Sequence, residues 1–386
     1  MHIDTRAILA PRKSEFGAVV PPVHLSSTFE LDIDSVSGDY AYQRGSNPSR
    51  ADLESVIASL EEAKYGFAFA TGMAAVSSVF SLLSPGDEVL FSSNVYGGTF
   101  RYVEKIFPRA GLTGTFFDDL GSITSEDLSE NTRMIFVETP GNPTLRVVDI
   151  ERLAKLAHAH GALLVIDNTF MTAVLQRPLD FGADLVVQSA TKFLGGHSDL
   201  LAGAVTTNDD ELAENIRLSQ KVFGSVLEPL TSFRLLQAIK TLPLRIARQQ
   251  ENAEKLVAFL SDHPAVQTVL SAGSFSEAER EVHERQAKGI GAVFSFELAQ
   301  GYDLKKFLHA LEIPSFAVSL GGVESLLSIP ATMSHDGMTQ AARDRAGITD
   351  GLVRFSAGIE NIDDLLADFA KALDAAQNSP LSPSLS

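Results

Sequence analysis

The feature that most constrains the fold is a series of short apolar runs separated by helical patterns. Four of these runs are predicted strands: "DEVLFSS" (87–93), "RMIFVETP" (133–140), "ALLVIDN" (162–168) and "DLVVQSA" (184–190). Each run is continuously apolar instead of alternating, which is expected when helices cover both faces of a sheet. The pattern therefore predicts an α/β fold with a mostly parallel sheet.

Helical patterns lie before and between these runs. The first is expected from about Arg50 to Lys64, because Leu53, Val56, Ile57 and Leu60 recur at helical spacing. Further helices are predicted to start near Gly72 and to cover 97–107 and 149–161, the last of them closed by Gly161 as a C-cap.

A length of 386 residues favours two domains over one. Residues 1–50 are rich in Pro, Ser and Asp and are predicted to form an irregular arm. Residues 51–242 are predicted to form the large domain. Residues 243–386 differ in pattern and predict a smaller α+β domain, with a tail, "NSPLSPSLS", expected to be disordered. The elements expected in the smaller domain are helices over 248–263 and 363–376, and strands over 292–298, 324–329 and 351–357.

The charge and the residue usage exclude several classes of function. A formal net charge of −18 opposes binding to nucleic acid or to an anionic membrane. The chain contains no cysteine, which excludes disulfides, a catalytic thiolate and a cysteine-rich zinc site. The N-terminus lacks the apolar core of a signal peptide, and the apolar runs are too short to span a bilayer. A cytoplasmic protein without membrane or nucleic-acid partners is expected.

Two charged residues stand at the ends of predicted strands. Asp167 ends "ALLVID", and Lys192 follows "DLVVQSA" in "SATKFLGGHSD". Functional residues collect beyond the strand ends of such sheets, so the two side chains can converge on one ligand. A structural Asp–Lys ion pair would produce the same spacing. His197 is interpreted as a structural hydrogen-bonding residue, and no metal site is expected.

The neighbours of Lys192 indicate a phosphate-bearing cofactor. Ser189 and Thr191 carry hydroxyls that can donate to phosphate, and the Gly72 and Met73 amides would form an anion site at a helix N-terminus. A lysine, a phosphate site and a buried acid are what pyridoxal phosphate requires: the lysine forms a Schiff base and the acid keeps the pyridine nitrogen protonated. Tyr96 in "NVYGGTF" could stack on the ring.

Several stretches in a fixed order resemble the Cys/Met-metabolism family of pyridoxal-phosphate enzymes, which holds cystathionine γ-synthase, the cystathionine β- and γ-lyases and methionine γ-lyase. The resemblance covers nearly the whole chain and implies the fold-type I, aspartate-aminotransferase-like architecture. The stretches are "YQRGSNPSR", "ATGMAA", "VYGGTF", "ETPGNPTL", "IDNTF", "SATKFLGGHSD" and "SLGGVESLLSIPATMSH".

The resemblance implies a role for each cofactor residue. Lys192 resembles the Schiff-base lysine, Asp167 the partner of the pyridine nitrogen, and Tyr96 the stacking ring that helps to activate the substrate amine. Tyr42 and Arg44 resemble arm residues that reach the cofactor phosphate of a neighbouring subunit, which implies a dimer with shared sites within a homotetramer. The phosphate cradle of the family is matched by Gly72, Met73, Ser189 and Thr191.

The resemblance also implies a set of substrate residues. Arg354 matches the arginine that binds the substrate α-carboxylate in a bidentate way, with Asn142 and Ser319 in the same pocket. Arg101 and Glu324 resemble the pair that recognises the distal end of cystathionine, although Ala41 stands where many of those enzymes carry an acidic residue.

The first hypothesis is a lyase that cleaves the carbon–sulfur bond of cystathionine in the γ or the β direction. In either case the freed Lys192 removes the α-proton as a general base. Methionine γ-lyase is disfavoured because Gly98 replaces its usual cysteine. The alternative is cystathionine γ-synthase, which joins an O-acylhomoserine to cysteine. A non-catalytic relative that binds the cofactor or an amino acid is a third hypothesis.

Overall fold

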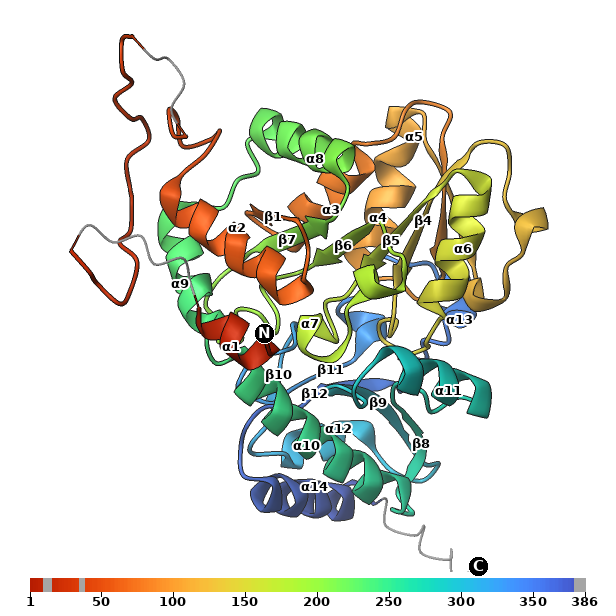
Figure 1. The fold of residues 1–386 in the computed structure, drawn as a ribbon. Helices are drawn as coiled ribbons and strands as arrows, with labels where there is room; N and C mark the ends of the chain where they lie inside the picture. The colour runs from red at the N-terminus through yellow and green to blue at the C-terminus, as the bar shows by residue number, and fades with distance from the viewer. Residues whose placement is uncertain (10–15, 35–38, 378–386) are drawn as a thin grey trace, which may run out of the picture.

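The computed structural model describes residues 1–9, 16–34 and 39–377, and the chain forms two sheets with helices packed around each (Figure 1). The seven-stranded sheet lies within residues 65–207 and the five-stranded sheet within residues 266–356. The predicted disordered tail, 378–386, lies outside the described residues. The boundaries of the arm and the two domains stay predictions.

The large sheet is mostly parallel, as predicted. Its order is β1-β7-β6-β5-β4-β2-β3, and only β7 runs antiparallel to its neighbours. The four predicted strands are β2, β4, β5 and β6, whereas β1, β3 and β7 were not predicted. The strands are β1 (Tyr65–Phe69), β2 (Glu88–Ser92), β3 (Thr113–Phe117), β4 (Thr132–Glu138), β5 (Leu163–Asp167), β6 (Leu185–Gln188) and β7 (Gly203–Thr207).

Helices cover both faces of this sheet, which is why the strands are apolar throughout. Along β5, Val165 packs into one core cluster, while Leu164 and Ile166 pack into another on the opposite face. One face is covered by α3 (Gly72–Phe80), α4 (Gly97–Lys105), α5 (Phe107–Ala110) and α8 (Asp210–Phe223). The other face is covered by α2 (Pro48–Glu61), α6 (Ile150–His160), α7 (Thr172–Leu175) and α9 (Pro229–Ile239).

Chemistry at the helix ends explains where several of these helices begin and end. The side chain of Asn47 caps α2, with a proline at the first helical position, and Asp149 caps α6. Gly161 ends α6 in a left-handed conformation with φ 74°, which confirms it as the predicted C-cap.

The smaller sheet is mainly antiparallel and confirms the α+β prediction, with the order β10-β11-β12-β9-β8. Its strands are β8 (Val266–Leu270), β9 (Val293–Leu298), β10 (Ser315–Phe316), β11 (Leu326–Ser328) and β12 (Val353–Ser356). Its core contains apolar residues of α10 (Leu242–Ser261) and α14 (Ile362–Ala376), together with Phe307 of α12 (Leu304–Ala310). Two further helices in this part of the chain are α11 (Glu277–Gln286) and α13 (Gln340–Arg345). The helix predicted over 248–263 begins earlier, at Leu242, because Pro243 is tolerated in a first helical turn.

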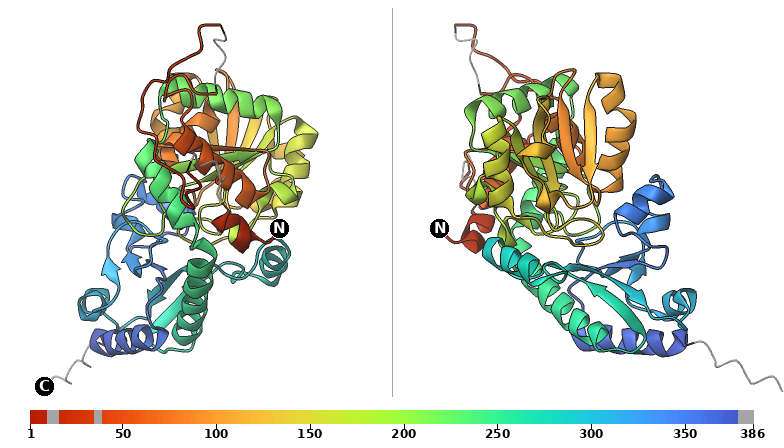
Figure 2. Two further views of the ribbon diagram at one scale, coloured as in Figure 1. Left: turned by 60° about the vertical axis from the view of Figure 1, so that its left-hand side comes forward. Right: turned by 90° about the vertical axis from the view of Figure 1, so that its right-hand side faces the viewer.

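The N-terminal arm is not irregular throughout, which corrects the prediction. Residues Ile3–Ile8 form a short helix, α1, whose N-terminus is capped by the side chain of His2. The arm is anchored there because Ala7 is buried in the core and Arg6 donates to the Ser59 carbonyl. Beyond this helix the described part of the arm extends away from the body as a loop (Figures 1 and 2).

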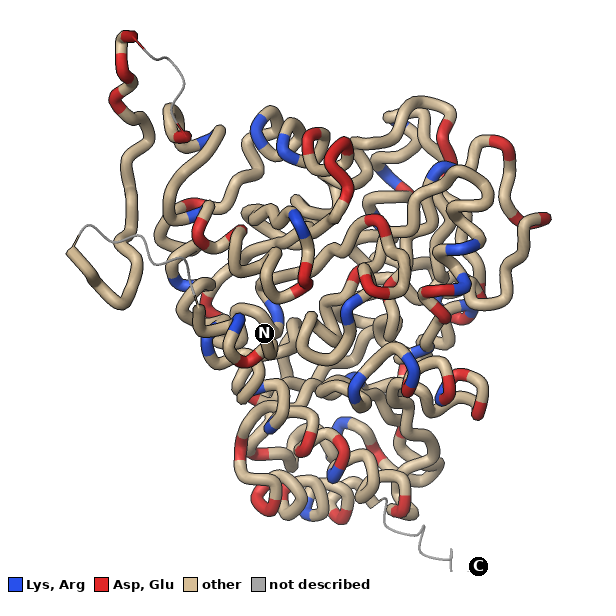
Figure 3. Tube along the Cα trace, viewed as in Figure 1, with Lys and Arg blue, Asp and Glu red and all other residues tan. Residues whose placement is uncertain are grey.

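Charged residues lie mainly on the outer helices and loops, and acidic and basic residues are interspersed (Figure 3). Within the large sheet the charged side chains occur at or next to the strand ends, as with Glu138 and Asp167. Among the described residues, no helix is both long enough and apolar enough to cross a membrane.

Candidate active site

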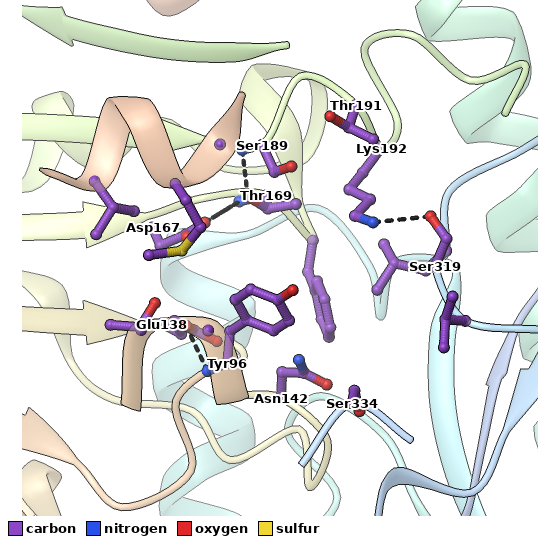
Figure 4. A pocket seen from close by; sticks show the side chains of 18 of the residues that line it. Tyr96, Glu138, Asn142, Asp167, Thr169, Ser189, Thr191, Lys192, Ser319 and Ser334 are labelled. Atoms are coloured by element: carbon purple, nitrogen blue, oxygen red, sulfur yellow. Dashed lines mark hydrogen bonds between the residues drawn. The ribbon is translucent and has the colours of Figure 1, made fainter. Parts of the chain in front are cut away.

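A cavity of about 610 Å³ opens at the carboxyl ends of the parallel strands. This volume lies within the range of pockets that hold small molecules and cofactors. Figure 4 shows side chains from the strand ends and from the smaller domain pointing into it. The cavity brings together most of the residues predicted from sequence, namely Gly72, Met73, Tyr96, Arg101, Asn142, Asp167, Ser189, Thr191, Lys192, Ser319 and Arg354.

Strand topology explains why residues far apart in sequence meet here. Strands β1, β2, β4, β5 and β6 all run in the same direction, so their carboxyl ends lie along one edge of the sheet. Gly72 opens the helix after β1, and Tyr96 stands directly before the helix after β2. Asp167 is the last residue of β5, and Ser189 follows β6. These residues therefore lie at one edge of the sheet because the strands that precede them are parallel.

Lys192 projects into the cavity from the turn that follows β6. Its Nζ donates to the Ser319 hydroxyl across the cavity at 2.8 Å (Figure 4). Burial, together with the positive charge of Arg354, lowers the pKa of the amine to about 8. No carboxylate forms an ion pair with Lys192 among the described residues, so a structural Asp–Lys pair with Asp167 is absent from that part of the chain.

Ser319 occupies an unusual backbone conformation beside the lysine. Its φ of 94° lies in the left-handed region that residues other than glycine seldom adopt. This conformation accompanies two contacts in the cavity, because the Ser319 hydroxyl accepts from Lys192 and its carbonyl accepts from Arg354 Nη2 at 2.8 Å. Such strain persists where surrounding contacts fix the backbone, which is common at binding sites.

Asp167 is buried and held in a fixed orientation. One oxygen, Oδ1, accepts hydrogen bonds from the Thr169 amide at 3.0 Å and the Thr169 hydroxyl at 2.5 Å. Burial raises the pKa of Asp167 to about 6, while the two bonds from Thr169 oppose the rise. The hydroxyl of Thr169 also accepts from the Ser189 amide at 2.8 Å. Thr169 therefore links Asp167 to the segment that carries Lys192. The sequence analysis did not predict Thr169 as a site residue.

Glu138 is a second buried acid in the cavity that the sequence reasoning missed. It is the last residue of β4 and pairs in register with Asp167 of β5. Burial raises the pKa of Glu138 well above its ordinary value, and the charge of Asp167 raises it further. Its Oε1 accepts a hydrogen bond from the Tyr96 amide at 2.7 Å, and so positions the residue before α4 (Figure 4). The rule that selected Asp167, an acid ending an apolar run, also selects Glu138.

The start of α3 offers donors to an anion. The Thr71 hydroxyl and carbonyl accept from the amides of Ala74 and Ala75, and the first helical amides, at Gly72 and Met73, have no acceptor within the helix. Gly72 also permits a close approach, because a Cβ there would lie 2.8 Å from the Ser189 Cβ and Oγ. The helix N-terminus and the Ser189 hydroxyl thus converge in the way that phosphate binding requires.

Arg354, on β12 of the smaller sheet, is a buried cation that lines the cavity. Its side chain donates to Asn142 Oδ1 at 3.0 Å and to the Ser319 carbonyl. Burial lowers the pKa of the guanidinium to about 10. It has no carboxylate partner among the described residues, which leaves a buried positive charge facing the cavity. A buried charge is costly unless it is paired, so the site is complementary to a ligand carboxylate.

Three predicted site residues do not line the cavity in the isolated chain. Tyr42 is 54% exposed, and Arg44 donates to the Lys221 carbonyl near the end of α8. Glu324 lies against Ser198, whose hydroxyl donates to its Oε2 at 3.3 Å. The arm residues and the distal-group residue therefore lie apart from the side chains around Lys192.

The comparisons with known proteins all indicate the same group of enzymes. The sequence profile of the family described as "Cys/Met metabolism PLP-dependent enzyme" matches residues 4–374. The chain is 45% identical to cystathionine beta-lyase MetC of Bacillus subtilis, over 96% of each chain. Its structure resembles cystathionine gamma-lyase from Lactobacillus plantarum complexed with L-serine, with TM-score 0.94 and 40% identity over 97% of this chain and 99% of the other. It also resembles cystathionine gamma synthase from Xanthomonas oryzae in complex with cystathionine, with TM-score 0.94 and 38% identity over 97% and 98%.

Proposed function

The chain belongs to the Cys/Met metabolism PLP-dependent enzymes, and we propose that it is a lyase that cleaves the carbon–sulfur bond of cystathionine. The observation that carries the proposal is the pair of Lys192 and Arg354 in one cavity. One is an amine with a lowered pKa, and the other is a buried guanidinium without a carboxylate partner among the described residues. Together they suit an amino-acid substrate, whose carboxylate would bind Arg354 while its α-carbon faces Lys192.

The residues present fit pyridoxal phosphate. The unpaired amides at the start of α3, together with Ser189 and Thr191, would hold the phosphate. Asp167 would bind the pyridine nitrogen, and its second oxygen suits that contact because Oδ1 is already used by Thr169. Tyr96 would lie against the ring from the start of α4.

The chain's own residues supply binding, orientation and proton transfer. When bound, pyridoxal phosphate supplies an electron sink for the electron pair that remains on the α-carbon when the substrate loses its α-proton. Arg354 binds the substrate α-carboxylate, and Asn142 orients the guanidinium. The Nζ of Lys192 takes the α-proton as a neutral amine, because its pKa near 8 leaves an appreciable fraction unprotonated. Ser319 holds the amine on the correct side of the cavity.

The keto acid released from L-cystathionine tests this function and its direction. Release of 2-oxobutyrate means cleavage at the γ-carbon with cysteine and ammonia as the other products, and pyruvate means cleavage at the β-carbon with homocysteine and ammonia. Either product supports the lyase. If neither appears, the likeness to the synthase from Xanthomonas oryzae favours the second candidate, which joins an O-acylhomoserine to cysteine. If purified protein stays colourless after pyridoxal phosphate is added, the cofactor assignment is overturned.

Replacing Lys192 tests the assignment of the general base. Lys192→Ala should lower kcat by at least about a thousandfold, because it removes both the proton acceptor and the covalent anchor of the cofactor. The visible absorbance of the purified protein should change with it. Lys155→Ala is the matched control, since Lys155 is an exposed lysine of α6 paired with Glu151. Activity retained by Lys192→Ala would refute the role of this residue.

We further propose that the site is shared between two copies of the chain within a homotetramer, built as a dimer of catalytic dimers. Two observations support association: the extended arm (Figure 2) and a set of exposed apolar side chains on α8, on α9 and in the loop before β7. Exposed apolar surface of this kind marks contact sites. Tyr42 and Arg44 would then reach the phosphate of the neighbouring copy. The exposed apolar residues are Leu201, Leu218, Val222, Phe223 and Leu230. A cytoplasmic location stays a prediction that cell fractionation can check.

A further inference from the structure

Each of two neighbouring strand ends carries an acid that lines the cavity, followed by a residue that is buried away from it. Glu138 ends β4 and is followed by Thr139, and Asp167 ends β5 and is followed by Asn168. Successive side chains of an extended strand point to opposite sides. The two acids therefore face the cavity, whereas Thr139 and Asn168 are at most 1% exposed and are not among its lining residues.

A single buried side chain joins these two strand ends on the side away from the cavity. Gln176, the residue after α7, is 2% exposed. Its Nε2 donates to the Thr139 carbonyl at 2.8 Å and to Asn168 Oδ1 at 3.0 Å, which uses both N–H groups of the amide. Asn168 Nδ2 donates in return to the Gln176 carbonyl at 2.7 Å. One carboxamide thus holds both strands, one residue beyond each acid.

The backbone around Gln176 also contacts the segment that leads into the smaller sheet. Gln176 forms an antiparallel bridge with Ala287, and the Lys288 amide donates to the Leu175 carbonyl at 2.9 Å. This segment continues into β9, which pairs with β12, the strand of Arg354. Gln176 therefore lies where the strand ends that carry the two acids meet the chain that leads to the sheet of Arg354.

A buried carboxamide often does no more than satisfy buried backbone groups. Gln176 differs in the place of its two acceptors, because each belongs to a residue that directly follows an acid of the cavity. A strand end that loses this contact is free to shift, and its acid shifts with it. A displacement of about 1 Å at reacting groups can cost about a hundredfold in rate.

We infer that Gln176 is a positioning residue for the reaction, which fixes the ends of β4 and β5 and so holds Glu138 and Asp167 at the cavity. The inference rests on the proposed function, in which Asp167 binds the pyridine nitrogen and Glu138 positions Tyr96. Gln176 does not itself line the cavity. It acts through the backbone of the two strands, and its own bridge to Ala287 keeps them against the segment that leads to β9.

The test compares Gln176→Met with the wild-type holoenzyme. Methionine keeps the bulk of the side chain and removes both N–H donors, while the backbone bridge to Ala287 remains. The kcat for L-cystathionine should fall about tenfold with KM changed less than about threefold, because the variant disturbs the reacting groups and leaves Arg354 in place. The visible circular dichroism of bound pyridoxal phosphate should change as well, because it reports how the ring is held.

Asn252→Leu is the matched control. Asn252 is a fully buried carboxamide of α10 whose Nδ2 donates to the carbonyls of Gly358 at 3.0 Å and Glu360 at 2.9 Å, and none of the three residues lines the cavity. Both variants should lower Tm, since each removes two buried hydrogen bonds. Only Gln176→Met should change kcat and the dichroism. If both variants lose stability but keep kcat and the dichroism, Gln176 has a structural role alone and the inference is overturned. Equal changes of kcat and dichroism in the control overturn it too.

Asn168→Ala keeps the inference testable if Gln176→Met does not fold. It leaves the bond from Gln176 to the Thr139 carbonyl, so it should lower kcat less, about threefold, with a change of dichroism in the same direction. Wild-type values for Asn168→Ala would contradict the inference. A wild-type holoenzyme that releases no keto acid refutes the lyase instead. The dichroism of the variants then still decides the inference, because it requires only bound pyridoxal phosphate.

Discussion

At the scale of single residues, the cavity is defined by ionisable groups that burial has shifted away from their ordinary behaviour. Burial lowers the pKa of Lys192 to about 8 and raises that of Asp167 to about 6. Each shift comes mainly from desolvation, which disfavours the charged form of both residues. A group with a shifted pKa in a cavity is a candidate for chemistry, and here the geometry supports the same assignment.

The lowered pKa of Lys192 predicts how apoprotein captures the cofactor. Only the neutral amine can attack an aldehyde, so the rate of cofactor binding should rise with pH and level off above about pH 8. Stopped-flow absorbance between about pH 6 and pH 10 measures this rate. Arg354→Gln should move the midpoint upward, because the positive charge of Arg354 is the second cause of the lowered pKa. A midpoint near the ordinary lysine value in the wild type would contradict the prediction.

Glu138 is predicted to act as a protonated positioning residue. Burial and the neighbouring charge of Asp167 both raise its pKa, and its Oε1 accepts from the Tyr96 amide. Glutamine reproduces a neutral carboxyl with the same acceptor, so Glu138→Gln should keep kcat within about threefold, whereas Glu138→Ala should lower it more than about tenfold by releasing Tyr96. Steady-state kinetics on both variants decides. A glutamine variant as damaged as the alanine variant would mean that the negative charge is required.

At the scale of elements, a buried acid joins helix α2 to strand β6. Glu61, the last residue of α2, accepts a hydrogen bond from the side-chain amide of Gln188 at the end of β6. Glu61 Oε2 and Gln188 Oε1 are buried and make no hydrogen bond among the described residues. Burial raises the pKa of Glu61 to about 8. This contact supports the strand that leads to Lys192.

The pKa of Glu61 predicts a pH-dependent stability. The folded protein keeps a proton that the unfolded chain loses above about pH 4.5, so the free energy of unfolding should fall as pH rises from there to about 8. Glu61→Gln removes this penalty and should add about 1–3 kcal/mol near pH 8, measured by urea unfolding. Glu62→Gln is the control. Glu62 is more exposed and paired with Arg6 and Arg177, so its replacement should give no such gain. Equal responses of the two variants would contradict the assignment.

The helices and strands also show which sequence patterns predict secondary structure correctly. Strands β4 and β5 and helix α6 were predicted because they are long, apolar or periodic, with clear caps. Strand β7, "GAVTT", was missed because its small and polar residues resemble a loop, although it is fully buried between β1 and β6. Burial between two neighbours is a tertiary property that a five-residue pattern does not carry.

At the scale of the whole molecule, the isolated chain holds most of a site but not the arm residues predicted to complete it. Tyr42 is exposed and Arg44 donates to the Lys221 carbonyl on α8, next to the exposed apolar residues Val222 and Phe223. A surface of this kind is unfavourable in water unless another copy covers it. Assembly and cofactor binding are therefore expected to be linked.

Arg44→Ala tests that link. It should weaken pyridoxal-phosphate binding by about tenfold without dissociating the assembly, because it removes one charged contact to a phosphate. Titration of absorbance measures the affinity, and analytical ultracentrifugation measures the assembly. Arg248→Ala is the control, since Arg248 is an exposed arginine of α10 paired with Glu251. A monomeric form with full activity would refute the shared site.

Much of the fold and of the site follows from the chain alone. Apolar runs between helical patterns imply a parallel sheet, and a parallel sheet aligns its carboxyl ends, so the sequence itself predicts that Asp167, Ser189 and Lys192 lie together. The helix that starts at Gly72 and the C-cap at Gly161 follow from local chemistry, which depends on neighbours in sequence. These inferences needed only short-range rules and one rule of topology.

Other features depend on contacts that sequence spacing does not encode. The register of β4 against β5 places Glu138 beside Asp167, and the fold of a loop 235 residues away sets Asp336 against Arg101. The same folding places Glu324 beside Ser198 and not in the cavity. Direct contact, burial and the pKa shifts that follow from it arise only when distant segments exclude water from one another, so the pairing of charges in this cavity is a property of the folded chain.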